Sequence, residues 1–118
     1  MSEEPEIEIP SNLDEAVLAL RKMMPSDTTA EWAAQSRQEA TTVAHMGIGM
    51  WLRNNWGLWG GSVLREFFEK EFRLDHADDM SGLILDALWC DLNEKPRQTA
   101  ARWAEFKAHW KERAAWGG

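Results

Sequence analysis

The sequence predicts an all-α fold, a compact bundle of about five helices. Apolar residues recur at spacings of three and four along most of the chain, which is the period of a helix. Helix-capping residues and prolines fall at the ends of these periodic segments. No segment alternates apolar and polar residues as a half-buried strand does, and no internal repeat is visible.

The chain divides into three predicted parts. Its 118 residues suit one small domain. Residues 1–10 carry four glutamates and two prolines, so we expect an acidic, disordered tail. Residues 11–96 are expected to form the helical domain, and residues 97–118 a basic helix packed on it.

The first helix is predicted to begin at Ser11 or Asn12. Ser11 with Asp14, and Asn12 with Glu15, both have the spacing of a capping box. Pro25 ends the helix. One apolar stripe marks its buried face: Leu13, Ala16, Val17, Leu20 and Met24.

A second helix is predicted to begin at Thr28, which forms a capping-box pair with Glu31. It is expected to run through Trp32 and Ala40 into the glycine- and tryptophan-rich residues 45–61. The glycines of residues 57–61 then interrupt the chain.

Three more helices complete the predicted bundle. Ser62 is the expected N-cap of the third, and its inward residues are Val63, Leu64, Phe67, Phe68 and Phe72. Asp75 or His76 caps the fourth, whose core stripe is Met80, Leu83, Ile84, Ala87, Leu88 and Leu92. Pro96 stops that helix, and the fifth begins near Thr99.

Residues 45–61 are the least ordinary part of the sequence, with three tryptophans and five glycines. A helix that is apolar nearly all round is typical of the middle of a bundle. Arg53 within it requires a partner, and Asp78, Asp79 and Asp86 are the candidate acids. The segment is either a packing core or a tryptophan-walled pocket for an anionic ligand. Its ligand- or partner-binding candidates are His45, Trp51, Arg53, Asn54, Asn55, Trp56 and Trp59, with His76 and Asp79 from the following segment.

Residues 47–59, GIGMWLRNNWGLW, closely resemble the signature of a bacterial and phage domain family of unknown function. Residues 13–16, His76 and residues 78–86 also resemble that family, so the likeness covers about residues 11–96. Ala77 stands where the family usually has proline, and the fifth helix is an addition. The resemblance implies a small helical domain and no established activity, cofactor or catalytic residue.

Other chemistries have weak support in the sequence. Cys90 with His76 or His109 would make a nucleophile pair, but a lone cysteine in a core helix is more typical of a small buried hydrophobe. His76, Asp78 and Asp79 resemble metal ligands, yet acids at a helix start commonly serve the helix dipole. Residues 57–61 lack the lysine and hydroxyl of a phosphate loop. We therefore expect no catalytic residues, no metal and no cofactor.

The charge distribution favours a protein partner. The net charge is −7, while residues 97–118 carry five bases and two acids. The acidic body disfavours direct nucleic-acid binding, and no stretch is long and apolar enough to span a membrane. The last helix either packs on the body or docks a partner through Arg102, Trp103, Phe106, Trp110 and Arg113.

The function predicted from these observations is a small, acidic, non-enzymatic protein-binding module. Its concrete form is an inhibitor of the immunity or anti-defence kind that blocks a basic effector protein, and a homodimer is left open. The alternative is a ligand-binding or enzymatic domain with an anionic pocket around Arg53. The single cysteine and the absence of a signal-like N-terminus predict a cytoplasmic protein.

Overall fold

The structure is a computed structural model that describes the backbone of residues 8–117 and the side chains as far as Glu112. Within this range the chain forms seven helices and no strand. They are α1 (Leu13–Met23), α2 (Ser26–Ala33), α3 (Arg37–Met46), α4 (Ile48–Asn55), α5 (Val63–Phe72), α6 (Ala77–Leu92) and α7 (Thr99–Gly117). The all-helical prediction is confirmed, and the predicted number of about five helices is too low. The tail predicted for residues 1–10 falls mostly on residues 1–7, outside the described part.

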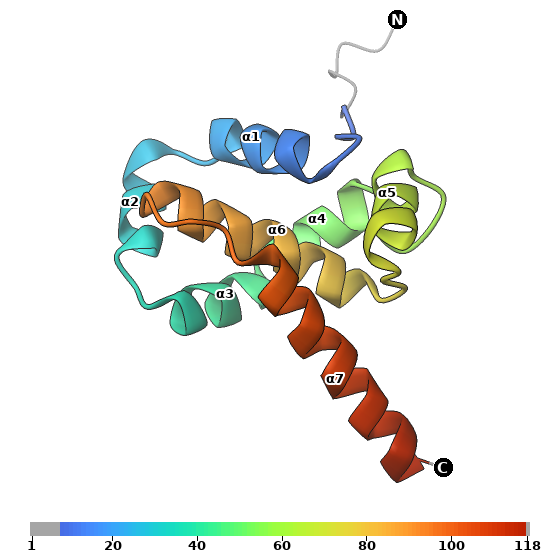
Figure 1. Cartoon of the computed structure of the whole chain (residues 1–118). Coiled ribbons are helices and arrows are strands. Elements are labelled where there is room, and N and C mark those ends of the chain that lie inside the picture. The colour runs from blue at the N-terminus through green and yellow to red at the C-terminus, as the bar shows by residue number, and fades with distance from the viewer. Residues whose placement is uncertain (1–7, 118) are drawn as a thin grey trace, which may run out of the picture.

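Helix α6 occupies the centre, and each of the other six helices packs against it (Figure 1). Its predicted core stripe is buried from Met80 to Leu88, with Leu92 half-buried. The centre was expected to be the glycine- and tryptophan-rich helix. That segment instead forms the short helix α4, which exposes 41% of Met50. Helix α7 contacts the body as far as Trp110, and its C-terminal end extends away from it (Figure 1).

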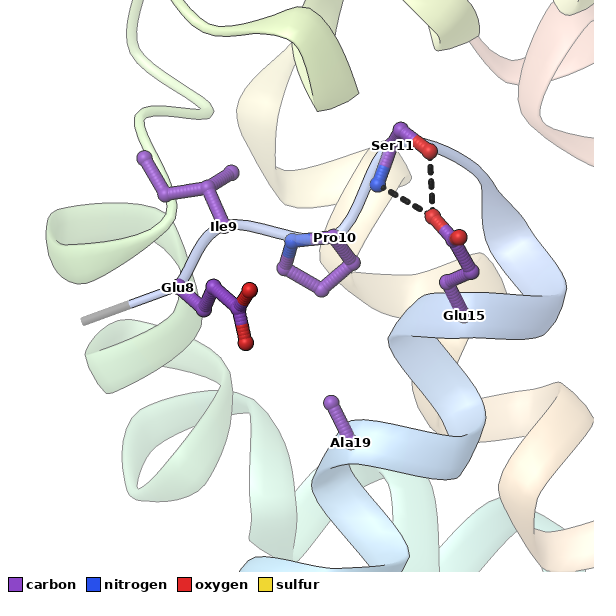
Figure 2. A pocket seen from close by; sticks show the side chains of 6 residues that line it. All are labelled: Glu8, Ile9, Pro10, Ser11, Glu15 and Ala19. Carbon is purple, nitrogen blue, oxygen red and sulfur yellow. Dashed lines mark hydrogen bonds between the residues drawn. The ribbon is translucent and has the colours of Figure 1, made fainter.

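The N-terminus of α1 is capped as the sequence predicts. The Asn12 side chain accepts a hydrogen bond from the Glu15 backbone N–H at 2.9 Å. Ser11 does not pair with Asp14. Its backbone N–H and its hydroxyl both donate to the Glu15 carboxylate, beside a small hollow that Pro10 and Ala19 help to line (Figure 2). These bonds lower the pKa of Glu15, since they favour its charged form.

The predicted second helix is broken into α2, α3 and α4. It begins at Ser26 instead of Thr28, and one break spans residues 34–36. Side chains of α6 and its C-cap bind the carbonyls that this break frees: Trp89 Nε1 donates to Gln35 O at 3.1 Å, and Asn93 Nδ2 donates to Ala33 O at 3.1 Å. Tertiary hydrogen bonds thus replace the helical ones.

Helix α4, which carries Arg53, is positioned by the second break, at Gly47, and by the turn that follows it. Gly57 lies at φ +66°, and a Cβ there would stand 2.6 Å from Ser62 Cβ, so this position requires glycine. The Ser62 hydroxyl donates to Gly57 O at 2.9 Å and caps α5 as predicted. Val63 was expected to face inward, but it is 59% exposed. No helix in the described range is long and apolar enough to cross a membrane.

Candidate functional site

A cleft of about 460 Å³ lies between α3, α6 and α7, and the buried acids Asp79 and Asp86 line it. Its walls carry charged or polar side chains from all three helices, including Arg37, His45, Asp79, Asp86, Arg102 and Glu105. Three polar clusters meet here, centred on Arg53, Asp86 and Asp79. We treat this cleft and its clusters as the candidate functional site.

The Arg53 guanidinium is enclosed by partners from the same chain. It lies on α4 with only 3% of the residue exposed. Nη1 donates to Ser81 Oγ at 2.9 Å, and Nη2 donates to His45 O at 3.0 Å. Nε lies 3.3 Å from Asp78 Oδ1, but it is not aligned for a hydrogen bond. Of the three candidate acids, Asp78 therefore pairs with Arg53.

Close packing fixes the position of this guanidinium. A Cβ at Gly49 would stand 3.0 Å from Ala44 O and 3.1 Å from Arg53 Nη1. The absence of a side chain at Gly49 thus lets α4 lie close to α3 and leaves room for the Arg53 guanidinium. Arg53 belongs to α4 and binds residues of α3 and α6, so its side chain joins the three helices.

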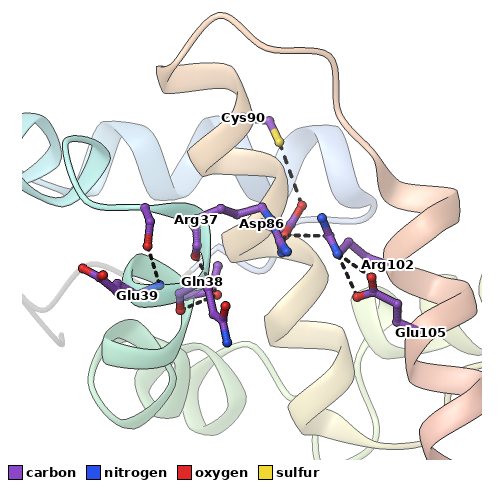
Figure 3. Close-up of polar contacts among 9 residues, drawn as sticks. Arg37, Gln38, Glu39, Asp86, Cys90, Arg102 and Glu105 are labelled. Carbon is purple, nitrogen blue, oxygen red and sulfur yellow. Dashed lines mark hydrogen bonds and ion pairs between the residues drawn. The ribbon is translucent and has the colours of Figure 1, made fainter.

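The second cluster is centred on Asp86, which is 5% exposed (Figure 3). Arg37 Nη1 donates to Asp86 Oδ2 at 2.6 Å, and Arg102 Nε lies 3.2 Å from the same oxygen. Arg102 also donates to both oxygens of Glu105, at 2.7 and 2.8 Å. One buried carboxylate therefore joins α3 and α7 to α6 through two arginines.

The third cluster joins Asp79, His76 and Trp110. Trp110 Nε1 donates to Asp79 Oδ2 at 2.6 Å, and the indole stacks on His76 with ring centres 3.7 Å apart. Burial raises the pKa of Asp79, while the hydrogen bond from Trp110 opposes that rise. His76 and Asp79, two predicted candidates, are thus brought together by the C-terminal helix.

Helix α7 supplies hydrogen-bond donors, and the body supplies acceptors. Trp103 Nε1 donates to Phe72 O, and Lys107 Nζ donates to Arg73 O, at the C-terminal end of α5. The last carbonyls of a helix have no hydrogen-bond donor within that helix, so Trp103 and Lys107 supply the missing donors. Phe106 lies against Gly82, where a Cβ would be 3.2 Å from the ring. The side chain of Arg113, the remaining predicted docking residue, lies outside the described residues.

The three tryptophans of the predicted pocket differ in burial, although Trp51 and Trp56 pack edge to face with ring centres 6.0 Å apart. Trp56 is 1% exposed in the core. Trp59 is 63% exposed and donates to Asn54 Oδ1 at 2.8 Å. Trp51 lines a separate apolar groove of about 520 Å³ with Met23 and other residues of α1, α2 and α4. Asn55 donates to the Trp51 carbonyl inside its own helix.

Cys90, the candidate nucleophile, lies in surroundings that do not activate its thiol. Cys90 is buried, and burial first, then the nearby Asp86 charge, raises the pKa of its thiol. Among the described residues, no group of three His, Cys, Asp or Glu side chains is arranged to hold a metal ion.

Arg37 and Ser81 contribute to the clusters but were not predicted. Arg37 begins α3, and the break before it was not foreseen. Ser36 and Glu39 have the spacing of a capping box, and the Ser36 hydroxyl does accept a hydrogen bond from the Glu39 N–H at 3.2 Å. That spacing was the available signal. Nothing in the local sequence distinguishes Ser81 from an ordinary helical serine.

The fold and its cleft define a small helical domain with a buried network of arginines and carboxylates. Residues 9–92 match a protein-family model described as "Domain of unknown function (DUF6794)", and the chain belongs to this family. The match includes α1 to α6 and stops before α7. No curated protein and no solved structure matches the chain.

Proposed function

We propose that this chain is a small, acidic, non-enzymatic protein-binding module whose partner presents a basic amphipathic helix. The observation that carries the proposal is the contact between α7 and the body. A helix from a segment of net charge +3 lies on the domain, with its aromatic side chains against α6 and its donors directed at carbonyls and carboxylates.

The face under α7 is defined by Asp79, Gly82, Asp86 and the carbonyls of Phe72 and Arg73. It offers two buried carboxylates, two helix-end carbonyls and a close approach at the glycine. A helix that carries Trp or Phe anchors flanked by Lys or Arg complements all three features. In this chain α7 fills the face, and a partner helix of the same chemistry would displace it.

The finer form of the proposal is inhibition. By covering a basic helix, the module blocks an effector that needs that helix, as an immunity or anti-defence protein does. The net charge of −7 supports this form, because it favours encounter with a basic protein. A second copy whose α7 exchanges onto this face is the corresponding homodimer.

A synthetic peptide of residues 97–116 provides a defined probe. Helix α7 competes with the peptide in the wild-type chain, so weakening α7 with Trp110→Ala should expose the face. We expect calorimetry to show binding at least about tenfold tighter to this variant than to the wild-type chain. A peptide with Arg102 and Lys107 changed to Glu should not bind.

Trp59→Ala is the matched control, because it removes an exposed tryptophan from the turn after α4. It should bind the peptide no more tightly than the wild type does. Equal binding by both tryptophan variants, or none by either, would overturn the proposal. Trp110→Ala and the wild type can then be used to capture proteins from a lysate of the native cell. Mass spectrometry of the two samples shows whether the variant enriches a basic partner.

The ligand pocket around Arg53 is the second candidate function, and no observation favours it. The guanidinium is engaged by Ser81, His45 and Asp78, and it does not line the cleft.

A further inference from the structure

A further pocket, of about 360 Å³, shares Arg37 and Arg102 with the cleft and lies between the start of α3, the end of α6 and the start of α7. It is lined by three bases and no acid. The lining residues are Arg37, Lys95, Arg102, Trp89, Cys90, Pro96 and Gln98. The charged residues of this lining are thus all basic, although the chain has a net charge of −7.

The bases of this pocket exceed the acids that they contact. Asp86 is shared by Arg37 and Arg102, and Glu105 accepts from Arg102 alone. Lys95 Nζ lies 4.9 Å from the centre of the Trp89 ring and makes no ion pair among the described residues. The three bases of the lining thus share two acids in their ion pairs, and Lys95 pairs with neither.

Donor atoms in the pocket also lack acceptors. Arg37 uses Nη1 on Asp86, and Arg102 uses Nη1 on Glu105. The hydrogen bonds of the described residues leave Nη2 of each arginine, and Nζ of Lys95, without an acceptor. Unused guanidinium and ammonium donors around one hollow are the groups that bind carboxylates and phosphates.

We infer that this pocket binds a small oxyanion, either a carboxylate or a phosphate group, between Arg37, Lys95 and Arg102. The anion forms an ion pair with Lys95 and accepts hydrogen bonds from the three unused donors. Asp86 contacts both arginines and holds them in place. Because Arg37 belongs to α3 and Arg102 to α7, the bound anion also fastens α7 to the body.

The test is a titration of the full chain with inorganic phosphate and with citrate, at constant ionic strength with chloride as the reference anion. We expect saturable shifts of the backbone amide NMR signals of Lys95, Gln98 and Arg102. Lys95→Gln should weaken the affinity about tenfold, the usual effect of losing one charge-assisted hydrogen bond. Lys95 is exposed, so this variant is expected to fold.

Lys70→Gln is the matched control, because it removes the same charge from an exposed position on α5. It should bind the anions as the wild type does. Binding of phosphate alone supports a phosphate ligand, and binding of citrate alone supports a carboxylate ligand. The inference is overturned if neither anion gives saturable shifts, or if the two glutamine variants weaken binding equally.

Discussion

Replacing Arg53 by methionine distinguishes a structural role for this residue from a ligand-binding role. Methionine keeps much of the apolar stem, so the change removes chiefly the guanidinium. Two charge-assisted hydrogen bonds disappear, to Ser81 Oγ at 2.9 Å and to His45 O at 3.0 Å. After the substitution the Ser81 hydroxyl still donates to Asp78 O. The His45 carbonyl, in contrast, loses the hydrogen bond from Arg53.

The expected loss follows from these contacts. Hydrogen bonds to charged groups contribute about 1.5–3 kcal/mol each, so two give a loss of at least about 3 kcal/mol. The side chain of Asp78 is 56% exposed and regains water, so the ion pair adds little. For a chain of this size, a loss of about 3 kcal/mol corresponds to a fall of about 12 °C in Tm.

Urea unfolding followed by far-ultraviolet circular dichroism measures this loss in an all-helical protein. Arg53→Lys keeps the charge but cannot form the same fork, so it should lose an intermediate amount. Arg21→Met, on the exposed side of α1, is the control and should change the free energy of unfolding by less than about 0.5 kcal/mol. A loss below about 1 kcal/mol for Arg53→Met would refute the structural role and leave the guanidinium available for a ligand.

Three further substitutions test the turn, the α7 contact and the buried acid. Gly57→Ala should lower the free energy of unfolding by about 2 kcal/mol, because φ is +66° and the new Cβ meets Ser62 at 2.6 Å. Gly82→Ala should push Phe106 away, and hydrogen exchange should quicken in α7 while α6 stays protected. Asp79→Asn should abolish one pH-dependent part of the free energy of unfolding. Folding raises the pKa of Asp79, so the protonated carboxyl stabilises the fold fully below pH 3.8, the ordinary pKa, and this stabilisation is lost as the pH rises through the folded-state pKa.

Each of these substitutions has its own comparison. Gly47→Ala introduces a Cβ into open space and should cost far less than Gly57→Ala; equal costs would contradict the argument from the turn. Equal exchange rates in α7 before and after Gly82→Ala would show that the glycine is not needed for docking. The amide oxygen introduced by Asp79→Asn can still accept from Trp110, so the substitution removes the charge and keeps the hydrogen bond. Equal pH profiles of the free energy of unfolding, for wild type and Asp79→Asn, would therefore exclude the buried-charge explanation.

Local patterns predicted the parts of the fold that depend on neighbouring residues. The apolar stripe of α6 and the caps at Asn12 and Ser62 follow from spacing and side-chain chemistry alone. The break between α2 and α3 did not follow from any glycine or proline. It is stabilised by Trp89 and Asn93, which lie 54 and 60 residues further along the chain than the carbonyls they bind.

The candidate site was predicted in its residues more than in its arrangement. The need of Arg53 for an acid could be foreseen from burial, and Asp78 was among the three acids named. Trp51, Trp56 and Trp59 could not be placed from sequence, because the break at Gly47 and the turn at Gly57 set their directions. Arg37 joins the site only through the unforeseen start of α3.

The order of the helices along the chain also determines when the protein can fold during its synthesis. All the other helices pack on α6, yet α6 begins only at residue 77 of 118. Until it leaves the ribosome, the apolar stripes of α1 to α5 have no common surface to cover them. Folding therefore waits for the second half of the sequence, and the nascent chain before that point exposes apolar segments that chaperones bind.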